Sequence, residues 1–329
     1  MKPVNQSQVV IPFSILLTAL LVLSAGCSET PTGPLNKWTT IPMGGSGGSG
    51  GHPFLLQFGS SGSGNGQMGL PQSLAVDAAG NIYLADYSND RVQKFSSTGT
   101  YLSQWGTAGS ANGQFSGPSG IALDAAGNVY VADSSNNRIQ VFTGAGVYST
   151  QWGTYGTGNG QFASSWALAV DSTNNVYVVD ENNARVQKFT TAGVYVTQWG
   201  GSGSGSGAFS DPVGVGVDST GSVYVCDDGL SMIKKFSNTG TFLLQWGSSG
   251  SGNGQFYDAD GVAVSSSGNV YVADSGNSRI EQFTSMGIYV AQWGGGTTAF
   301  SDMDGIAVDS TGNIYGIDSG NSRIVKFGP

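Results

Sequence analysis

The sequence predicts an all-β protein made of six copies of one four-stranded unit. An Asp recurs with spacings of 47, 47, 47, 47 and 44 residues, and a Trp recurs every 47 residues in five copies. Each copy holds four short runs of alternating apolar and polar residues, separated by turn clusters of Gly, Asn, Asp and Ser. A fixed period of this length, with four short strands per unit, is the sequence form of a β-propeller blade. The repeated residues are Asp86, Asp133, Asp180, Asp227, Asp274 and Asp318, and Trp105, Trp152, Trp199, Trp246 and Trp293.

The two ends of the sequence predict how the ring closes. The sixth copy stops at Pro329, after its third strand. The segment 54–58 matches the fourth strand of the fourth copy, residues 242–246, and Phe58 lies 47 residues before Trp105. An open ring would leave apolar strand edges unpaired. We therefore expect a six-bladed propeller over residues 52–329, in which strand 54–58 completes the last blade.

Most repeated residues are predicted to be scaffold. Asp124 ends a first strand before a Gly-Asn turn, where an Asp side chain can bond its own backbone. Asp133 opens the next turn and can pair with Arg138, and five of the six copies offer this Asp/Arg pair. The Trp and Tyr columns are interpreted as packing between blades, and the Gly/Ser-rich segments as interblade loops. Cys226 is interpreted as a small buried residue between blades.

One repeat pattern resembles a known family. Its parts are Pro-Ser-Gly-Ile-Ala-Leu-Asp (118–124), Gly-Asn-Val-Tyr-Val-Ala-Asp (127–133) and Asn-Arg-Ile (137–139). The pattern resembles the NHL repeat, and the resemblance covers residues 54–329. It implies a six-bladed NHL propeller. That family includes lipoproteins, sensor domains of bacterial serine/threonine kinases, animal RNA-binding proteins and a peptide-amidating lyase, so the resemblance implies a fold and no single activity.

The N-terminal residues predict a cell-envelope location. Residues 1–26 look like a signal peptide whose apolar run, 9–23, is too short for a typical membrane span. The run ends in Leu-Ser-Ala-Gly-Cys, which resembles a bacterial lipobox, so we expect cleavage before Cys27 and lipidation of its thiol. The alternative is a plain secretory signal that leaves Cys27 as a free thiol. Ser28 after the Cys resembles outer-membrane sorting, which favours the outer membrane or the cell surface.

Residues 27–51 are predicted to form a tether, because they are rich in Gly, Ser, Thr and Pro and cannot bury a core. Contact with the membrane is therefore expected through the lipid anchor only.

Composition excludes several functions. The net charge is −9, and most Arg residues occupy one internal repeat position, so a phosphate-binding surface is not expected and nucleic acid is excluded as a partner. The amidating lyase resembles a zinc enzyme with several His ligands, whereas this chain has one His, His52, which we place in the tether. A Ser-His-Asp triad cannot be assembled around a His there.

Function is predicted where the copies differ. In propellers, the loop entering the first strand and the loop between the second and third strands share one face around the central channel. Non-repeated polar and aromatic side chains gather on this channel-entry face, and blade 4 departs further because Met232 replaces the Arg. Such residues on a concave rim favour a binding site. The predicted binding residues are Gln72, Tyr87, Trp166, Glu181, Asp228, Asp260 and Asp304.

We therefore expect a non-enzymatic scaffold that binds a protein, a peptide or a glycan and needs no cofactor. The alternative is a hydrolase or lyase that depends on a Ca²⁺ or Mg²⁺ ion. Its ligands would be Asp260 and Asp304, which lie in neighbouring blades and supply hard oxygen atoms.

Overall fold

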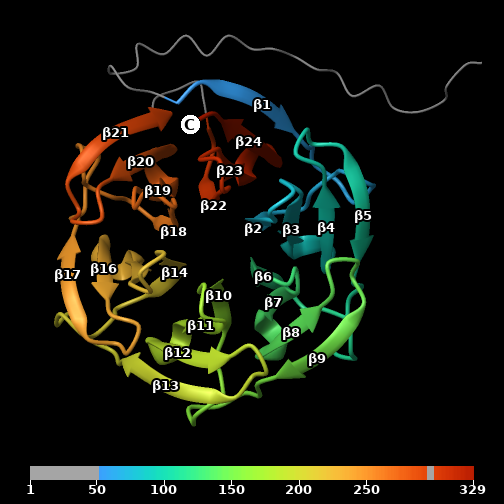
Figure 1. The fold of residues 1–329 in the computed structure, drawn as a ribbon, viewed down its shortest axis with the longest axis horizontal. Helices are drawn as coiled ribbons and strands as arrows, with labels where there is room; N and C mark the ends of the chain where they lie inside the picture. Colours follow the sequence, from blue (N-terminus) through green and yellow to red (C-terminus); the bar gives the residue numbers. More distant parts are fainter. Residues whose placement is uncertain (1–51, 295–299) are drawn as a thin grey trace, which may run out of the picture. The chain divides into compact units, whose positions relative to one another are not determined.

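The computed structural model describes residues 52–294 and 300–329. These residues form six four-stranded antiparallel sheets arranged in a ring, which confirms the predicted six-bladed propeller (Figure 1). The predicted signal peptide, Cys27 and the tether 27–51 lie outside the described residues. No helix in the described segments is long and apolar enough to cross a membrane.

Each blade runs from an innermost strand beside the channel to an outermost strand. The innermost strands of blades 1 to 6 are β2 (Pro71–Val76), β6 (Pro118–Leu123), β10 (Ser165–Val170), β14 (Pro212–Val217), β18 (Ala259–Val264) and β22 (Met303–Val308). The second strands are β3 (Ile82–Asp86), β7 (Val129–Asp133), β11 (Asn175–Asp180), β15 (Val223–Asp227), β19 (Val270–Asp274) and β23 (Ile314–Asp318).

A short 3-10 helix separates the second strand of each blade from the third. These helices are η1 (Tyr87–Asn89), η2 (Ser134–Asn136), η3 (Glu181–Asn183), η4 (Asp228–Leu230), η5 (Ser275–Asn277) and η6 (Ser319–Asn321). The third strands are β4 (Arg91–Phe95), β8 (Arg138–Phe142), β12 (Arg185–Thr190), β16 (Met232–Phe236), β20 (Arg279–Phe283) and β24 (Arg323–Phe327). The outermost strands are β5 (Tyr101–Trp105), β9 (Tyr148–Trp152), β13 (Tyr195–Gly200), β17 (Phe242–Trp246), β21 (Tyr289–Gly294) and β1 (Phe54–Phe58).

In blades 1, 2, 3 and 5 the repeated Asp/Arg pair ties the blade to the loop that enters it. In blade 1, Arg91 Nε donates to Asp86 Oδ2 at 2.7 Å, and both side chains are buried. The same guanidinium donates to the carbonyl oxygens of Gly64 and Gln67 in the Gly-rich loop. Asp86 Oδ1 in turn accepts from the amide of Gly69. The predicted pair is therefore confirmed, and it orders the Gly/Ser-rich interblade loop through charge-assisted hydrogen bonds.

The apolar core lies between the blades. Six clusters of buried side chains each combine residues from two neighbouring blades. Between blades 1 and 2, Trp105 lies 6.3 Å from Tyr83 and 5.9 Å from Phe142, measured between ring centroids. Cys226 is fully buried in the cluster between blades 4 and 5. The predicted structural roles of the Trp and Tyr columns and of Cys226 are confirmed.

The ring closes as predicted. β1 pairs antiparallel with β24 and forms the outermost strand of blade 6, with Phe58 opposite Ile324 (Figure 1). Phe58 also contacts Phe95 of blade 1, at 5.1 Å between ring centroids. His52 packs on the propeller, in agreement with the predicted boundary at residue 52, so its assignment to the tether in the argument about His ligands is wrong.

His52 packs on the propeller at a position where the other blades have glycine. Two residues before the outermost strand, Gly146 leaves no room for a Cβ against the Trp105 ring. His52 takes this place before β1, 4.7 Å from the Trp293 ring, and its Nδ1 lies 2.6 Å from the carbonyl oxygen of Gly328. The His52 imidazole therefore contacts both blade 6, through the Gly328 carbonyl, and blade 5, through the Trp293 ring.

Blade 4 keeps the ion pair without the arginine. Met232 replaces the Arg, and the sequence offered no Arg partner for Asp227. The structure places Lys234 there, with Nζ 2.8 Å from Asp227 Oδ2 and both side chains fully buried. Lys234 replaces the Gln that blades 1 to 3 carry two residues after the Arg, for example Gln93 after Arg91. Its ammonium group also donates to the carbonyl oxygen of Ala208. In blade 4 the positive charge is therefore supplied by a residue two positions later in the third strand than in the other blades.

Candidate binding site

One residue near the start of each innermost strand points toward the channel. The hydrogen-bond register of every innermost strand shifts near this residue, for example between Pro71 and Ser73 of β2 and between Ala259 and Gly261 of β18. A β-bulge re-aims a side chain. The sequence placed these residues just before the strand, and the structure makes them its second residue. They are called here the ring residues: Gln72, Ser119, Trp166, Val213, Asp260 and Asp304.

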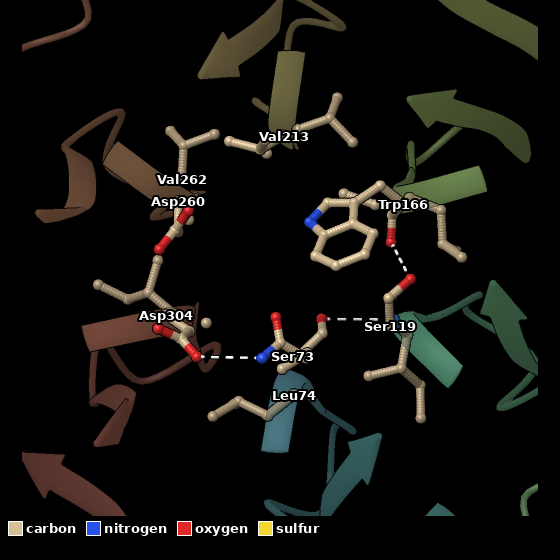
Figure 2. A pocket seen from close by; sticks show the side chains of 18 residues that line it. Ser73, Leu74, Ser119, Trp166, Val213, Asp260, Val262 and Asp304 are labelled. Atoms are coloured by element: carbon tan, nitrogen blue, oxygen red, sulfur yellow. Dashed lines mark hydrogen bonds between the residues drawn. The ribbon is translucent and has the colours of Figure 1, made fainter. Parts of the chain in front are cut away.

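Three consecutive residues of each innermost strand line a cavity in the channel, and the ring residues form the first of these three tiers. Figure 2 shows the lining side chains around the cavity. The second tier consists of small residues, and the third is aliphatic: Leu74, Ile121, Leu168, Val215, Val262 and Ile306. Small residues are required in the second tier because neighbouring strands approach closely. A Cβ on Gly214 would lie 2.3 Å from the carbonyl oxygen of Asp260. The cavity has a volume of about 100 Å³, and its polar end is called here the channel mouth.

Two carboxylic acids meet on one side of the channel mouth. Asp260 and Asp304 come from neighbouring blades and are half-buried. Burial, followed by the charge of Asp304, raises the pKa of Asp260 to about 8. Burial raises the pKa of Asp304 to about 6, against the hydrogen bond from Ser319, which lowers it. At neutral pH the pair therefore holds about one proton. Gln72 Nε2 donates to Asp304 Oδ2 at 3.3 Å.

An aromatic pair occupies the other side of the channel mouth. Figure 2 shows the Trp166 ring lying across the cavity, with its indole nitrogen turned away from its own strand. Ser119 Oγ donates to the carbonyl oxygen of Trp166 at 2.6 Å, which fixes the backbone there. The Trp166 and Tyr87 rings lie 6.2 Å apart between centroids, although they belong to blades 3 and 1. They meet because blade 2 offers only the small Ser119 between them.

Three of the predicted binding residues lie outside the cavity lining: Tyr87, which contacts Trp166, and Glu181 and Asp228. Glu181 begins η3 and accepts a hydrogen bond from Ser164 Oγ at 2.7 Å. Asp228 begins η4 and accepts from the amide of Ala259 at 3.2 Å. Burial raises the pKa of both carboxyl groups. The structure thus brings Gln72, Trp166, Asp260 and Asp304 into the cavity, sets Tyr87 against Trp166, and leaves Glu181 and Asp228 on the adjacent rim.

One acidic residue of this face, Asp211, was not among the predicted binding residues. Asp211 occupies the position of Asp258 and Asp302, two residues before the ring residue of its blade. Burial is the main cause that raises the pKa of Glu181 and of Asp228, and the negative charge of Asp211 raises both pKa values further. Burial, with the charge of Asp227, also raises the pKa of Asp211 itself. The column of Asp in blades 4, 5 and 6 was the signal that could have revealed it.

The basic residues of the described segments are engaged elsewhere. Five arginines and Lys234 form the buried blade ion pairs. Lys94, Lys188, Lys235 and Lys326 each lie over a Tyr ring, with Nζ 4.6–5.2 Å from the ring centroid. Within residues 52–294 and 300–329, neither Asp260 nor Asp304 forms an ion pair. The same segments contain no group of three or more His, Cys, Asp or Glu arranged to hold a metal ion.

This architecture defines a class of protein, the six-bladed β-propellers with a channel-mouth cavity. The NHL repeat model matches residues 68–95, 115–142, 162–189 and 256–283, which lie in blades 1, 2, 3 and 5. The chain therefore carries four recognised NHL repeats and is an NHL-repeat β-propeller. Blades 4 and 6 keep the same four strands with altered sequences. No curated protein matches the chain in sequence.

Solved structures share the fold at low identity. A gluconolactonase from Xanthomonas campestris is 15% identical with a TM-score of 0.60, over 79% of this chain and 87% of that chain. A virginiamycin B lyase from Staphylococcus aureus with quinupristin is 15% identical with a TM-score of 0.57, over 82% of each chain. A chain of a nidogen/laminin complex is 16% identical with a TM-score of 0.55, over 72% of this chain and 84% of that chain. At this identity the likeness shows the fold alone.

Proposed function

We propose that this chain is a lipid-anchored, extracytoplasmic NHL propeller that binds a protein, peptide or glycan through its channel mouth, without catalysis. One observation carries the proposal. The blades repeat the same buried residues at most scaffold positions, yet the ring residues include an amide, a hydroxyl, an indole, an aliphatic group and two carboxyl groups. A position that served only the scaffold would favour one kind of residue. A convergent set of different polar groups in a concavity is typical of a ligand site.

The channel-mouth residues are expected to be needed for capture of the partner and not for folding. We expect Trp166→Ala, and separately the double variant Asp260→Asn/Asp304→Asn, to weaken capture from intact bacterial envelope at least about tenfold. Aromatic and charged anchors in a cavity contribute heavily to interfaces. The three side chains are half-buried at the channel mouth. The Asn pair removes two carboxyl groups whose pKa values are raised by burial, so this variant should melt no lower than the parent protein at neutral pH. The measurements are a quantitative pull-down and a thermal melt of each variant.

Tyr155→Ala is the matched control, because Tyr155 is an exposed aromatic residue in an interblade loop, 76% accessible. It should capture the partner as the parent protein does. If the channel-mouth variants unfold, those residues are scaffold. If they fold and capture with unchanged affinity, the proposed site is wrong.

The alternative, a hydrolase or lyase dependent on Ca²⁺ or Mg²⁺, would work from Asp260 and Asp304. Titration calorimetry with each ion discriminates the two hypotheses. The binding hypothesis expects no heat beyond dilution. Stoichiometric binding that Asp260→Asn/Asp304→Asn abolishes would establish the metal site instead.

Lipid anchoring is proposed from the residues around Cys27, which lie outside the described part. We expect Cys27→Ala to move the protein from the membrane fraction to the soluble fraction, because the acyl chains would supply the anchor. One acyl chain alone gives marginal binding, so the two or three chains of a lipoprotein are needed. Fractionation of cells that express each form is the measurement. Retention of the Ala variant in membranes would contradict lipidation and favour the uncleaved apolar segment 9–23 as the anchor.

A further inference from the structure

The size of the cavity limits what can enter it. Pockets for drug-sized ligands have volumes of roughly 300–1,000 Å³, whereas this cavity measures about 100 Å³. The aliphatic third tier is buried, with side chains such as Leu74 and Val215 only 4% and 8% exposed. A ligand group that enters the channel mouth therefore meets apolar walls after one or two tiers. The cavity suits the end of one side chain.

The charge around the cavity selects the kind of group. Asp260 is faced by the carboxylates of Asp304, Asp228 and Asp258 and by the hydroxyl of Ser275. Asp304 is faced by Asp302 and Asp318, by the hydroxyls of Ser275 and Ser319, and by the amide of Gln72. No basic side chain is among these neighbours. A cation entering from solvent would relieve the repulsion between the two carboxyl groups.

The wall opposite the two acids adds a second, independent preference. The Trp166 ring lies across the cavity (Figure 2), and the Tyr87 ring packs against it at 6.2 Å between centroids. An indole face attracts an ammonium or a guanidinium group by about 0.5–2 kcal/mol, and Trp is the best of the aromatic residues for this contact.

We infer that the channel mouth binds one guanidinium or alkylammonium group, as carried by an Arg or Lys side chain, over the face of the Trp166 ring and beside the Asp260–Asp304 pair. This inference rests on the proposed function, and it supplies the chemical class of the ligand. Trp166 supplies the cation–π face, and Asp260 and Asp304 supply the counter-charge. Gln72 holds Asp304 in place through its 3.3 Å hydrogen bond.

Titration calorimetry on the mature chain tests the inference with four probes. These are the capped tripeptides Gly-Arg-Gly and Gly-Lys-Gly, the uncharged Gly-Gln-Gly, and n-butylguanidinium. We expect the two basic peptides to bind at least about tenfold tighter than the Gln peptide, with an affinity that falls as salt rises. Asp260→Asn/Asp304→Asn should abolish this preference, and Trp166→Ala should weaken it several-fold. Tyr155→Ala should leave it unchanged.

Proton release provides a readout that a purely structural role would not give. The pKa of Asp260 is about 8, so this group is mostly protonated at pH 7. A bound cation lowers that pKa, and binding should release a fraction of a proton at pH 7 and almost none at pH 9.5. Titrations in phosphate and in Tris, which differ in ionisation enthalpy, measure the release. The same heat in both buffers at pH 7 would overturn the inference.

The probes distinguish two sources of the cation, a side chain of a polypeptide and a free small molecule. Tighter binding of the Arg peptide than of n-butylguanidinium indicates a group presented by a polypeptide, and equal affinities indicate recognition of the group alone; both support the inference. Equal binding of the Gln and Arg peptides overturns it. In that case, loss of partner capture by Trp166→Ala would leave the proposed function standing with a different ligand. Capture that survives every channel-mouth variant would refute the proposed function itself.

Discussion

Deletion of residues 52–59 is expected to unfold the whole propeller, whereas deletion of residues 28–50 should leave its melting unchanged. β1 is held by three blades. Its backbone pairs with β24 of blade 6, Phe58 packs on Phe95 of blade 1, and His52 just before it packs on Trp293 of blade 5. Without β1 the third strand of blade 6 becomes an open edge, and the contacts across the closure are lost.

The size of the effect follows from the side chains involved. Deletion removes the partly buried Phe54, Leu56 and Phe58 and uncovers Ile324 and Phe327, which are 0% and 3% exposed. A fully buried large apolar side chain contributes about 1.5–3 kcal/mol. The sum is roughly 5 kcal/mol or more, comparable with the whole stability of an ordinary domain, about 5–15 kcal/mol. Circular dichroism melts of the two deletions are the measurement, and equal melting of both would contradict the closure.

The fold could be predicted because its signals are repeated. An Asp, a Trp and a Gly-Asn turn that recur every 47 residues give the same strand pattern in most blades, so a weak local signal is supported by its copies. Phe58 belongs to the same column as Trp105, which was enough to predict the closing strand. His52 could not be assigned this way, because it replaces the glycine of its column and no pattern predicts a His on the Trp293 ring.

The candidate site was predicted only in part, because it lies where the repeat breaks. Unlike residues at one repeat position identified Gln72, Trp166, Asp260 and Asp304. The bulges that turn these residues into the channel are a property of the backbone register and leave no residue signature of their own. Lys234 was not predicted as the partner of Asp227, because in the other blades the equivalent Asp pairs with an Arg two residues before the position of Lys234. Only the pairing of β15 with β16 shows that the Lys234 ammonium group reaches the same carboxylate.

The second large effect is expected at Glu281 in blade 5. Blades 1 to 3 have a Gln at this position. In blade 1, Gln93 Oε1 accepts from the amide of Gly66, and Gln93 Nε2 donates to the Gln67 carbonyl and to Asp86. The position therefore needs one acceptor and one donor. Lys234 of blade 4 also supplies a donor, so Glu281 stands alone among these five blades in having no hydrogen to donate when it is ionised.

The contacts of Glu281 show the mismatch. Its Oε1 accepts from the amide of Gly254 at 3.1 Å, as the Gln does. Its Oε2 is buried without a hydrogen-bond partner. Arg279 Nη2 lies 3.5 Å from that oxygen, which is an ion contact longer than a good hydrogen bond. Burial, only partly opposed by Gly254 and Arg279, raises the pKa of Glu281 to about 7. A protonated Glu281 regains the missing donor.

The direction of the pH dependence follows from this pKa. The unfolded chain releases the Glu281 proton near pH 4.5, whereas the folded chain keeps it up to about pH 7. Between these values the folded state binds more protons, so the free energy of unfolding falls as the pH rises. Above about pH 7 the loss is complete. At about 1.36 kcal/mol per pKa unit it amounts to roughly 3 kcal/mol. The free energy of unfolding therefore rises as the pH is lowered from about 7 to about 4.5, because Glu281 is then protonated in the folded state.

Glu281→Gln is therefore expected to stabilise the propeller by roughly 3 kcal/mol at pH 8 and by much less at pH 5, because the amide supplies the donor at every pH. A change of 1 kcal/mol shifts the melting temperature by about 2–4 °C in a domain of this size. The reverse change in blade 1, Gln93→Glu, is the matched control: it places the same carboxyl group beside Asp86 and should destabilise at pH 8 and recover toward pH 5. Thermal melts of the three proteins at both pH values are the measurement. If Glu281→Gln gives the same gain at pH 5 as at pH 8, the buried carboxyl group does not titrate in this range and its missing donor is satisfied in another way.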